Sequence, residues 1–170
     1  ILVNRATGVY FHEIFGHRIE GHRQKSEMEG QTFAKKVGEK ILPEFIDVYD
    51  DPTQGEFNGT FLRGHYLYDD EGVKTTPVTV VEKGVLRNFL LSRSPVKGFP
   101  KSNAHGRKQA GMDAVARQGN LMVKSSKEVS FDKLVEMLRD ECRTQNKPYG
   151  LIFYDISGGF TTTTRFGPQS

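Results

Sequence analysis

Three residues near the start of the chain could bind and use a metal ion: His12, Glu13 and His17, within the stretch HEIFGHRIEGH. Neutral imidazole is a good ligand for Zn²⁺, and a neighbouring carboxylate can take a proton from water bound to the ion. The familiar arrangement, H-E-x-x-H, places its two histidines four residues apart on one face of a helix. In this chain Gly16 stands at that position, and the second histidine comes one residue later.

The five-residue spacing constrains the backbone between the histidines. On a regular α-helix five residues turn through about 500°, which leaves His12 and His17 about 140° apart and unable to share one ion. A π-bulge, a kink or the end of the helix within Ile14–Arg18 would bring both rings to one side, and Gly16 tolerates such a distortion best. We therefore expect a non-α geometry there, with Glu13 pointing into the same cleft. The alternative is an ordinary amphipathic helix whose histidines are solvated or hydrogen-bonded.

The elements that must position these residues predict an α+β domain. Apolar residues recur at helical spacing from Ala6 to Arg23, and a second amphipathic helix is predicted over residues 130–146. Hairpin patterns beside separate helices argue against a doubly wound sheet. We expect a twisted antiparallel or mixed sheet with both helices packed on it. The other predicted elements are a short helix over 31–42, strands at 45–51, 120–125, 149–156 and 160–166, a strand running into a turn over 65–72, and a hairpin over 77–92.

Composition narrows the class of protein. The 170 residues suit one domain or a piece of a larger protein, and 24 Lys+Arg against 21 Asp+Glu give a net charge of +3. The single cysteine, Cys142, excludes an internal disulfide framework and any zinc site built from several cysteines of this chain. Its place on the apolar stripe of the second helix predicts a buried structural thiol rather than a nucleophile. No run of 18 apolar residues occurs, so we expect no membrane span.

Basic residues gather in one segment. Between Arg87 and Arg117 there are seven basic residues and one acidic residue, among several glycines and prolines. This pattern predicts a long irregular loop over about 92–118, which either grips an anionic group, such as a peptide carboxylate or a phosphate, or is solvated and mobile. We expect the loop to be mobile or to become ordered through a partner chain.

Three blocks of sequence, in the correct order, resemble the TldD/PmbA family, once called modulators of DNA gyrase. They are HEIFGHRIEG, GVLRNFLLSRSPVKGFPKSNAHGR and KPYGLIFYDISGGFTTTTRFGPQS. The resemblance implies that residues 1–170 are part of the C-terminal, catalytic domain of a TldD-like protein, without its N-terminal domain and extreme C-terminal segment. It implies a zinc-dependent metallopeptidase that hydrolyses unstructured peptides. The intact HExxxH motif fits TldD better than its PmbA/TldE partners, which usually lack it.

The resemblance also implies roles for individual residues. His12 and His17 match the zinc-binding histidines, and Glu13 matches the general base that activates a metal-bound water. The family's third zinc ligand is a cysteine well beyond residue 170, so this chain alone is expected to hold zinc weakly and to be inactive. The remaining candidates are Glu20, Gly16 and Gly21 for support of the motif, His22 as an extra ligand or a surface histidine, and His105 and Arg107 for peptide contact.

A different class of function is a non-catalytic module that binds peptide or nucleic acid. The basic segment over 92–118 is its only support, because the sequence has no recognition-helix signature. We expect a peptide substrate, a homodimer or a heterodimer with a PmbA/TldE-like partner, a cytoplasmic location, and no membrane or nucleic-acid partner. Thr161–Thr164 is either an ordinary strand or an edge strand that pairs with an extended substrate.

Overall fold

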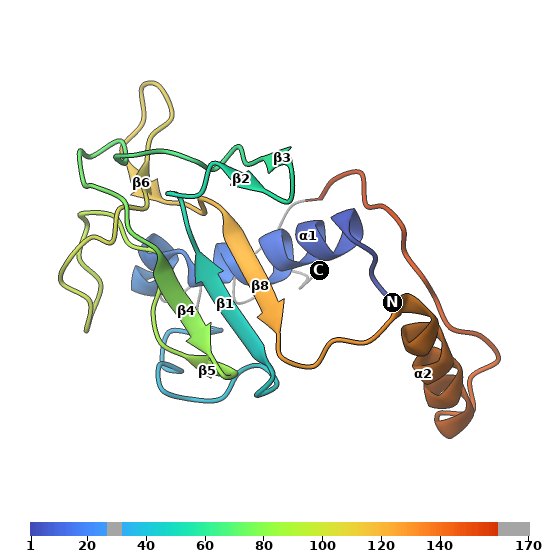
Figure 1. Ribbon diagram of the computed structural model, residues 1–170. Helices are drawn as coiled ribbons and strands as arrows, with labels where there is room; N and C mark the ends of the chain where they lie inside the picture. Colours follow the sequence, from blue (N-terminus) through green and yellow to red (C-terminus); the bar gives the residue numbers. More distant parts are fainter. Residues whose placement is uncertain (27–31, 160–170) are drawn as a thin grey trace.

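The computed structural model describes residues 1–26 and 32–159, and its centre is a four-stranded antiparallel sheet (Figure 1). The strand order is β5-β4-β1-β8, so the α+β class is confirmed. The strands of this sheet are β1 (Ile46–Asp50), β4 (Val78–Glu82), β5 (Val85–Leu86) and β8 (Leu121–Ser125). Two small sheets pair β2 (Glu56–Phe57) with β3 (Thr60–Phe61), and β6 (Gly106–Arg107) with β7 (Val115–Ala116).

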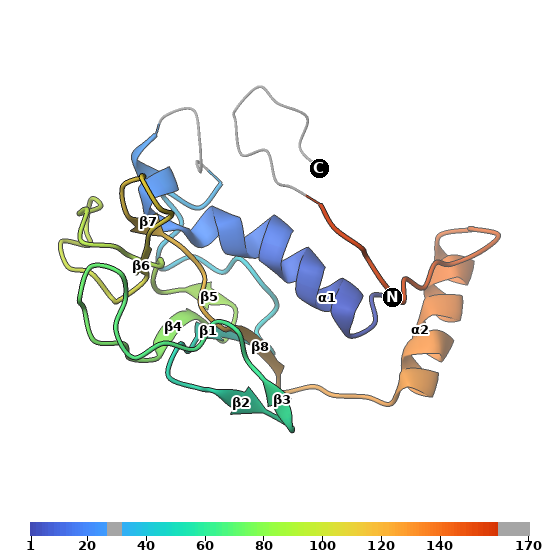
Figure 2. The same cartoon turned by 90° about the horizontal axis from the view of Figure 1, so that it is seen from above.

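Residues 5–25 lie across one face of the sheet and are helical except at Glu20, and the type of helix changes along them (Figure 2). They consist of α1 (Arg5–Tyr10), the π-helical turn η1 (Phe11–Phe15), and two 3₁₀ turns, η2 (Gly16–Ile19) and η3 (Gly21–Lys25). Phe15 and Ile19 project into the core, where they join Val48, Val80 and Leu90. The helix predicted from 6 to 23 is therefore confirmed as a helical segment up to Ile19 and is interrupted at Glu20, which is extended and bridges to Leu90. Its buried face carries the motif onto the sheet.

The hairpin predicted within 77–92 is formed by β4 and β5. Lys83 and Gly84 make the turn with φ angles of 47° and 77°, the left-handed pair that suits the twist of a two-residue hairpin. Gly84 is also required sterically, because a Cβ there would meet the backbone carbonyl oxygen of Leu42. The pairing of β4 with β5 ends at Leu86. The chain that follows places Phe89 in the core.

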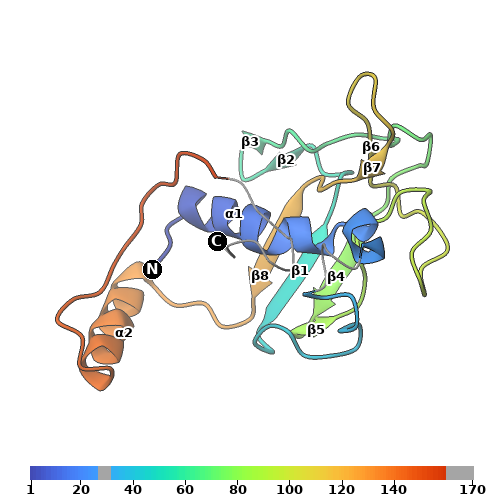
Figure 3. The same ribbon diagram turned by 180° about the vertical axis from the view of Figure 1, so that it is seen from behind.

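The second amphipathic helix, α2 (Phe131–Thr144), begins as predicted: the Ser130 side chain accepts a hydrogen bond from the Lys133 N–H. The prediction that it packs on the sheet is wrong, since α2 buries no residue and stands beside the sheet (Figure 3). Its apolar stripe instead meets the chain that follows it, where Leu138 fills the space beside Gly150. Cys142, on the same stripe, is half-buried rather than buried.

Residues 32–42 form turns, which corrects the helix predicted over 31–42. Gly38 has a φ of 88°, and its N–H donates to the Leu86 carbonyl oxygen at 2.8 Å. The Leu86 N–H in turn donates to the carbonyl oxygen of Glu39 at 3.0 Å. The backbone of this segment therefore bonds partly to itself in two turns, Lys36 to Phe33 and Glu39 to Lys36, and partly to the β4–β5 hairpin, which replaces the predicted helix.

Of the strand running into a turn that was predicted over 65–72, the turn is confirmed and the strand is reduced to one antiparallel bridge between Tyr68 and Lys74. One carboxylate oxygen of Asp69 accepts the N–H groups of Glu71 and Val73, at 3.0 and 2.8 Å, and its other oxygen accepts the Gly106 N–H. A buried aspartate that caps its own turn competes with strand pairing.

The strand predicted at 149–156 does not join the sheet. This segment pairs instead with the start of the chain, through one parallel bridge between Phe153 and Leu2. It does so because α2 follows β8 and the chain then returns beside the N-terminus. The strand predicted at 160–166, with Thr161–Thr164, lies outside the described residues. Among the residues described, no helix has the length and apolar character needed to cross a membrane.

The segment predicted as an irregular loop over 92–118 is packed against the core. It contributes β6 and β7, and Ala104 and His105 are fully buried. The side-chain oxygen of Asn103 accepts the Leu91 N–H at 2.7 Å, and its amide nitrogen donates to the Phe89 carbonyl oxygen at 2.8 Å. The amide thus satisfies backbone groups that no strand pairs and joins this part of the segment to the core. Residues 93–95 and 108–113 are exposed, and the predicted mobility stays a prediction.

Candidate metal centre

The backbone widens where the spacing of the two histidines requires it. Residues 11–15 form a π-helical turn, and the Gly16 N–H that closes this turn is directed at the carbonyl oxygens of Phe11 and His12. The chain then tightens into the 3₁₀ turn η2. As a result the ring centroids of His12 and His17 lie 4.7 Å apart. The expected non-α geometry is confirmed, because the helix is not regular between the two histidines.

Glu13 lies between the two rings. Its carboxylate oxygens are 3.8 Å from the Nε2 atom of His12 and 3.8 Å from the Nε2 atom of His17. One ligand atom from each residue lies within 4.8 Å of the others. Neighbouring ligand atoms around a tetrahedral zinc ion are about 3.4 Å apart, so small side-chain movements would bring both Nε2 atoms to one ion. The donor set therefore fits a metal ion.

The Glu20 carboxylate is fully buried and orients His17. It lies 2.9 Å from the His17 Nδ1 atom and also accepts the Nε–H of Arg23 at 2.8 Å and a guanidinium N–H of Arg117 at 3.0 Å. Burial opposes ionisation of Glu20, but the hydrogen bonds from His17 and Arg23 and the nearby charges outweigh it and hold the pKa of the carboxyl below its usual value. An ionised carboxylate can only accept, so the proton of neutral His17 sits on Nδ1 and leaves Nε2 able to bind metal.

Other chain segments approach both glycines of the motif closely. The side-chain amide of Gln118 occupies the space that a Cβ at Gly16 would need. At Gly21 a Cβ would lie 2.8 Å from both the Leu90 carbonyl oxygen and a methyl carbon of Leu91. The Gly21 N–H also donates to that Leu90 oxygen at 2.7 Å. Gly16 and Gly21 therefore support the motif by letting other chain segments approach it.

Substituting Gly21 by alanine is expected to lower the free energy of unfolding by about 1–3 kcal/mol, the usual effect of forcing an extra methyl group into a packed site. Gly8 of α1 is the matched control, because a Cβ there meets nothing within 4 Å. Gly8→Ala should raise the free energy of unfolding by up to about 1 kcal/mol through helix propensity. Denaturant unfolding followed by circular dichroism measures both. Equal effects of the two substitutions would contradict the steric role of Gly21.

The structure corrects the predicted role of His105. The side chain is fully buried, with Nδ1 2.9 Å from the Asn103 carbonyl oxygen and Nε2 3.2 Å from a carboxylate oxygen of the equally buried Asp50. A residue without exposed surface cannot contact a peptide, so His105 supports the fold. Arg107 is partly exposed: its guanidinium lies 4.3 Å from the centre of the Tyr66 ring and forms an ion pair with Asp70 at 3.2 Å. Its predicted peptide contact stays a prediction.

His22 is next to Glu20 and outside the cluster of His12, Glu13 and His17. Its Nε2 atom lies 4.0 Å from a Glu20 carboxylate oxygen. Within the described part of the chain, the His, Cys, Asp and Glu residues that lie close enough together to hold one metal ion are His12, Glu13 and His17. His22 is therefore not an additional ligand in this arrangement.

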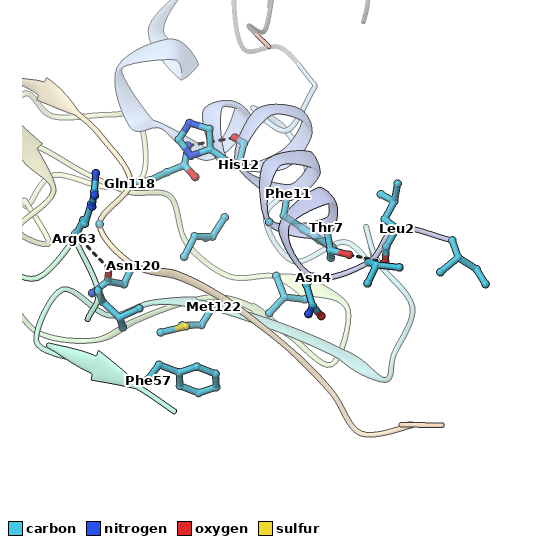
Figure 4. Close-up of a pocket in the computed structure, with 18 of the residues that line it drawn as sticks. Leu2, Asn4, Thr7, Phe11, His12, Phe57, Arg63, Gln118, Asn120 and Met122 are labelled. Carbon is cyan, nitrogen blue, oxygen red and sulfur yellow. Dashed lines mark hydrogen bonds between the residues drawn. The ribbon is translucent and has the colours of Figure 1, made fainter. Parts of the chain in front are cut away.

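A groove of about 1040 Å³ runs from the candidate metal centre along α1 and β8 (Figure 4). Its walls are mostly apolar, with Phe11, Phe57 and Met122 among the lining side chains, and His12 and Gln118 stand at one end. Sequence reasoning missed both the groove and Gln118, because they are assembled from segments that are distant in the chain. The glycine at position 16 was the available signal, since it marks a close approach by some other residue.

The chain is similar to a known protein family and to several named proteins. The family model described as "PmbA/TldA metallopeptidase C-terminal domain" matches residues 1–164. A "Metalloprotease" of Archaeoglobus fulgidus is 33% identical over 141 residues, covering 82% of this chain and 31% of that protein. A "Metalloprotease" of Methanothermobacter thermautotrophicus is 36% identical over 140 residues, covering 79% of this chain and 28% of that protein. The chain thus spans less than a third of the length of these relatives.

Solved structures share the fold. TldE from Thermococcus kodakarensis superposes with a TM-score of 0.65 at 21% identity, over 93% of this chain and 32% of that chain. A candidate modulator of a DNA gyrase from Thermotoga maritima superposes with a TM-score of 0.63 at 24% identity, over 88% of this chain and 30% of that chain. At these identities the likeness is one of fold.

Proposed function

The chain belongs to the PmbA/TldA metallopeptidase C-terminal domain family, and from this premise we propose that it carries the zinc-binding and catalytic residues of a peptidase that hydrolyses unstructured peptides. Its relatives are named metalloproteases, which implies a metal. The observation that carries the proposal is the meeting of His12, Glu13 and His17, whose ligand atoms lie within 4.8 Å of one another.

His12 and His17 would hold the ion through their Nε2 atoms. Two imidazoles beside a carboxylate are a donor set typical of zinc, and one relative is named a zinc metalloprotease TldD homolog. Bound zinc supplies a Lewis acid that polarises a carbonyl and acidifies water. We propose that residues 1–170 are part of a C-terminal catalytic domain and that the third ligand, a cysteine in the family, comes from outside this chain.

Glu13 is the proposed general base. Its carboxylate is 18% exposed and lies at equal distances from the two histidine Nε2 atoms, so a water seated beside both rings is within its hydrogen-bonding reach. Glu13 would take a proton from this water as it attacks the peptide carbonyl, and would then pass the proton to the leaving amine nitrogen. The test is peptide hydrolysis by the whole protein with Glu13→Gln, in which cleavage should be lost while metal stays bound.

The apolar groove beside His12 would seat the extended substrate. Phe57 lines it, whereas Phe61, on the partner strand of the same hairpin, is 83% exposed and does not. Phe57→Ser is expected to raise KM for peptide about five- to tenfold with little change in kcat, because it removes apolar contact made equally in the ground and transition states. Phe61→Ser should leave both constants unchanged. Steady-state kinetics on the two variants decide whether peptides use this groove.

We propose a second copy or a TldE-like protein as the partner, since the fold is shared with a TldE. The alternative of nucleic-acid binding gains no support from the basic segment. The guanidinium groups of Arg107 and Arg117 form ion pairs with Asp70 and Glu20, so the charge predicted from composition is partly neutralised locally.

A further inference from the structure

We propose that Arg117 and Gln118 are positioning residues for the two histidines, an inference that rests on the proposed function. These neighbours follow β7 and contact the motif across 97 and 106 residues of sequence. Neither belongs to the cluster of His12, Glu13 and His17. Each acts through another group, Arg117 through the Glu20 side chain and Gln118 through the backbone of the π-helical turn.

Arg117 fixes the carboxylate that orients His17. One of its guanidinium nitrogens donates to Glu20 at 3.0 Å, on the same oxygen that accepts from Arg23, while the other Glu20 oxygen contacts the His17 Nδ1 atom. The Arg117 backbone is itself anchored, because its N–H donates to the carbonyl oxygen of the fully buried His105 at 2.9 Å. A chain of hydrogen bonds thereby links the backbone of buried His105 to the ring of His17 through Arg117 and Glu20.

Gln118 holds the turn that carries His12. Its side-chain amide donates to the His12 carbonyl oxygen at 3.3 Å and fills the space beside Gly16 (Figure 4). The next residue is also fixed, since the Gly119 N–H donates to the Asp50 carboxylate at 3.1 Å. Gly16 and Gln118 are therefore one steric unit: any side chain at position 16 would expel the amide from its place on the turn.

The first experiment measures zinc affinity of the whole protein by competition with a chromophoric chelator, together with the visible spectrum of the cobalt-substituted protein. Arg117→Met should weaken zinc binding about 10- to 100-fold, as loss of a ligand's hydrogen-bonded support does. Arg117→Lys, which keeps a charged donor, should recover part of this loss and serves if the Met variant does not fold. Arg87→Met removes a comparable ion pair, 3.1 Å from Glu82 on the distant hairpin, and should stay within twofold of the parent.

The second experiment is a cycle of Gly16→Ala, Gln118→Ala and the double variant in the same assay. Because an alanine at position 16 displaces the amide, both single variants lose the same hydrogen bond and should weaken zinc binding by a similar factor of about two to ten. The double variant should bind no more weakly than either single one. Multiplication of the two effects, or a Gln118→Ala affinity within twofold of the parent, would overturn the role of Gln118.

His17→Ala, measured alongside, separates the two proposals. If it lowers zinc affinity strongly while Arg117→Met and Gln118→Ala bind like the parent, the metal centre stands and the positioning roles are wrong. If His17→Ala binds zinc as the parent does, the metal centre itself is misassigned and the positioning roles fall with it.

Discussion

Replacing Glu13 by glutamine is expected to lower kcat for peptide hydrolysis by about 10²–10⁴-fold, the range that general acid–base catalysis contributes. Glutamine has the same size and keeps a polar group between His12 and His17, but its amide cannot accept a proton. KM should change little, because the groove and the histidines are untouched. Zinc content should stay at the parent value, so the loss lies in the chemical step.

Glu39→Gln is the matched control for this measurement. Glu39 pairs with Lys36 at 3.3 Å on the surface, and its side chain is more than half exposed. Its substitution should leave kcat and KM unchanged. Parent-like cleavage by the Glu13→Gln protein would remove Glu13 as the base, and loss of zinc along with activity would assign it to metal binding instead.

Replacing His17 by alanine is expected to weaken zinc binding by about 10²–10³-fold, because the share of one of four coordination positions in a binding free energy of about 10–16 kcal/mol is about 2.5–4 kcal/mol. His17 has a ring held by buried Glu20, so its removal also leaves that carboxylate without one of its donors. His65→Ala is the matched control, because the His65 ring contacts the Pro52 carbonyl oxygen at 2.9 Å and lies outside the cluster.

Calorimetric titration of the whole protein with zinc measures both variants. The His65→Ala protein should bind one zinc ion with parent affinity. Tight one-to-one binding that survives His17→Ala would mean that the ligands have been named wrongly.

The widened turn was predictable from the sequence because it follows from geometry alone. Two histidines five residues apart can share an ion only if the helix is not regular, and Gly16 marked the place. The hairpin through Gly84 was predictable for a similar reason, since its turn chemistry is local. Features that depend only on residues adjacent in the sequence, such as these two turns, could therefore be predicted.

The packing around these elements depends on partners that periodicity does not identify. The amphipathic pattern of α2 specifies an apolar face but not its neighbour, and that face meets residues near Gly150 instead of the sheet. Likewise, a matching block of sequence marks His105 as important without saying that it is buried. Arg117 and Gln118 carry no local signal at all, because their role exists only after the chain has closed on itself.

The bond between Glu20 and Arg117 also sets when the site can form. Residues 97 apart must meet, so the centre forms only after a long loop has closed and strands between them have paired. On the ribosome His12 and Glu13 emerge before the groups that hold them in place, which follow about a hundred residues later. A nascent chain is itself an unstructured peptide. Under the proposed function, the centre that would act on such peptides is incomplete until residues 117 and 118 have been made.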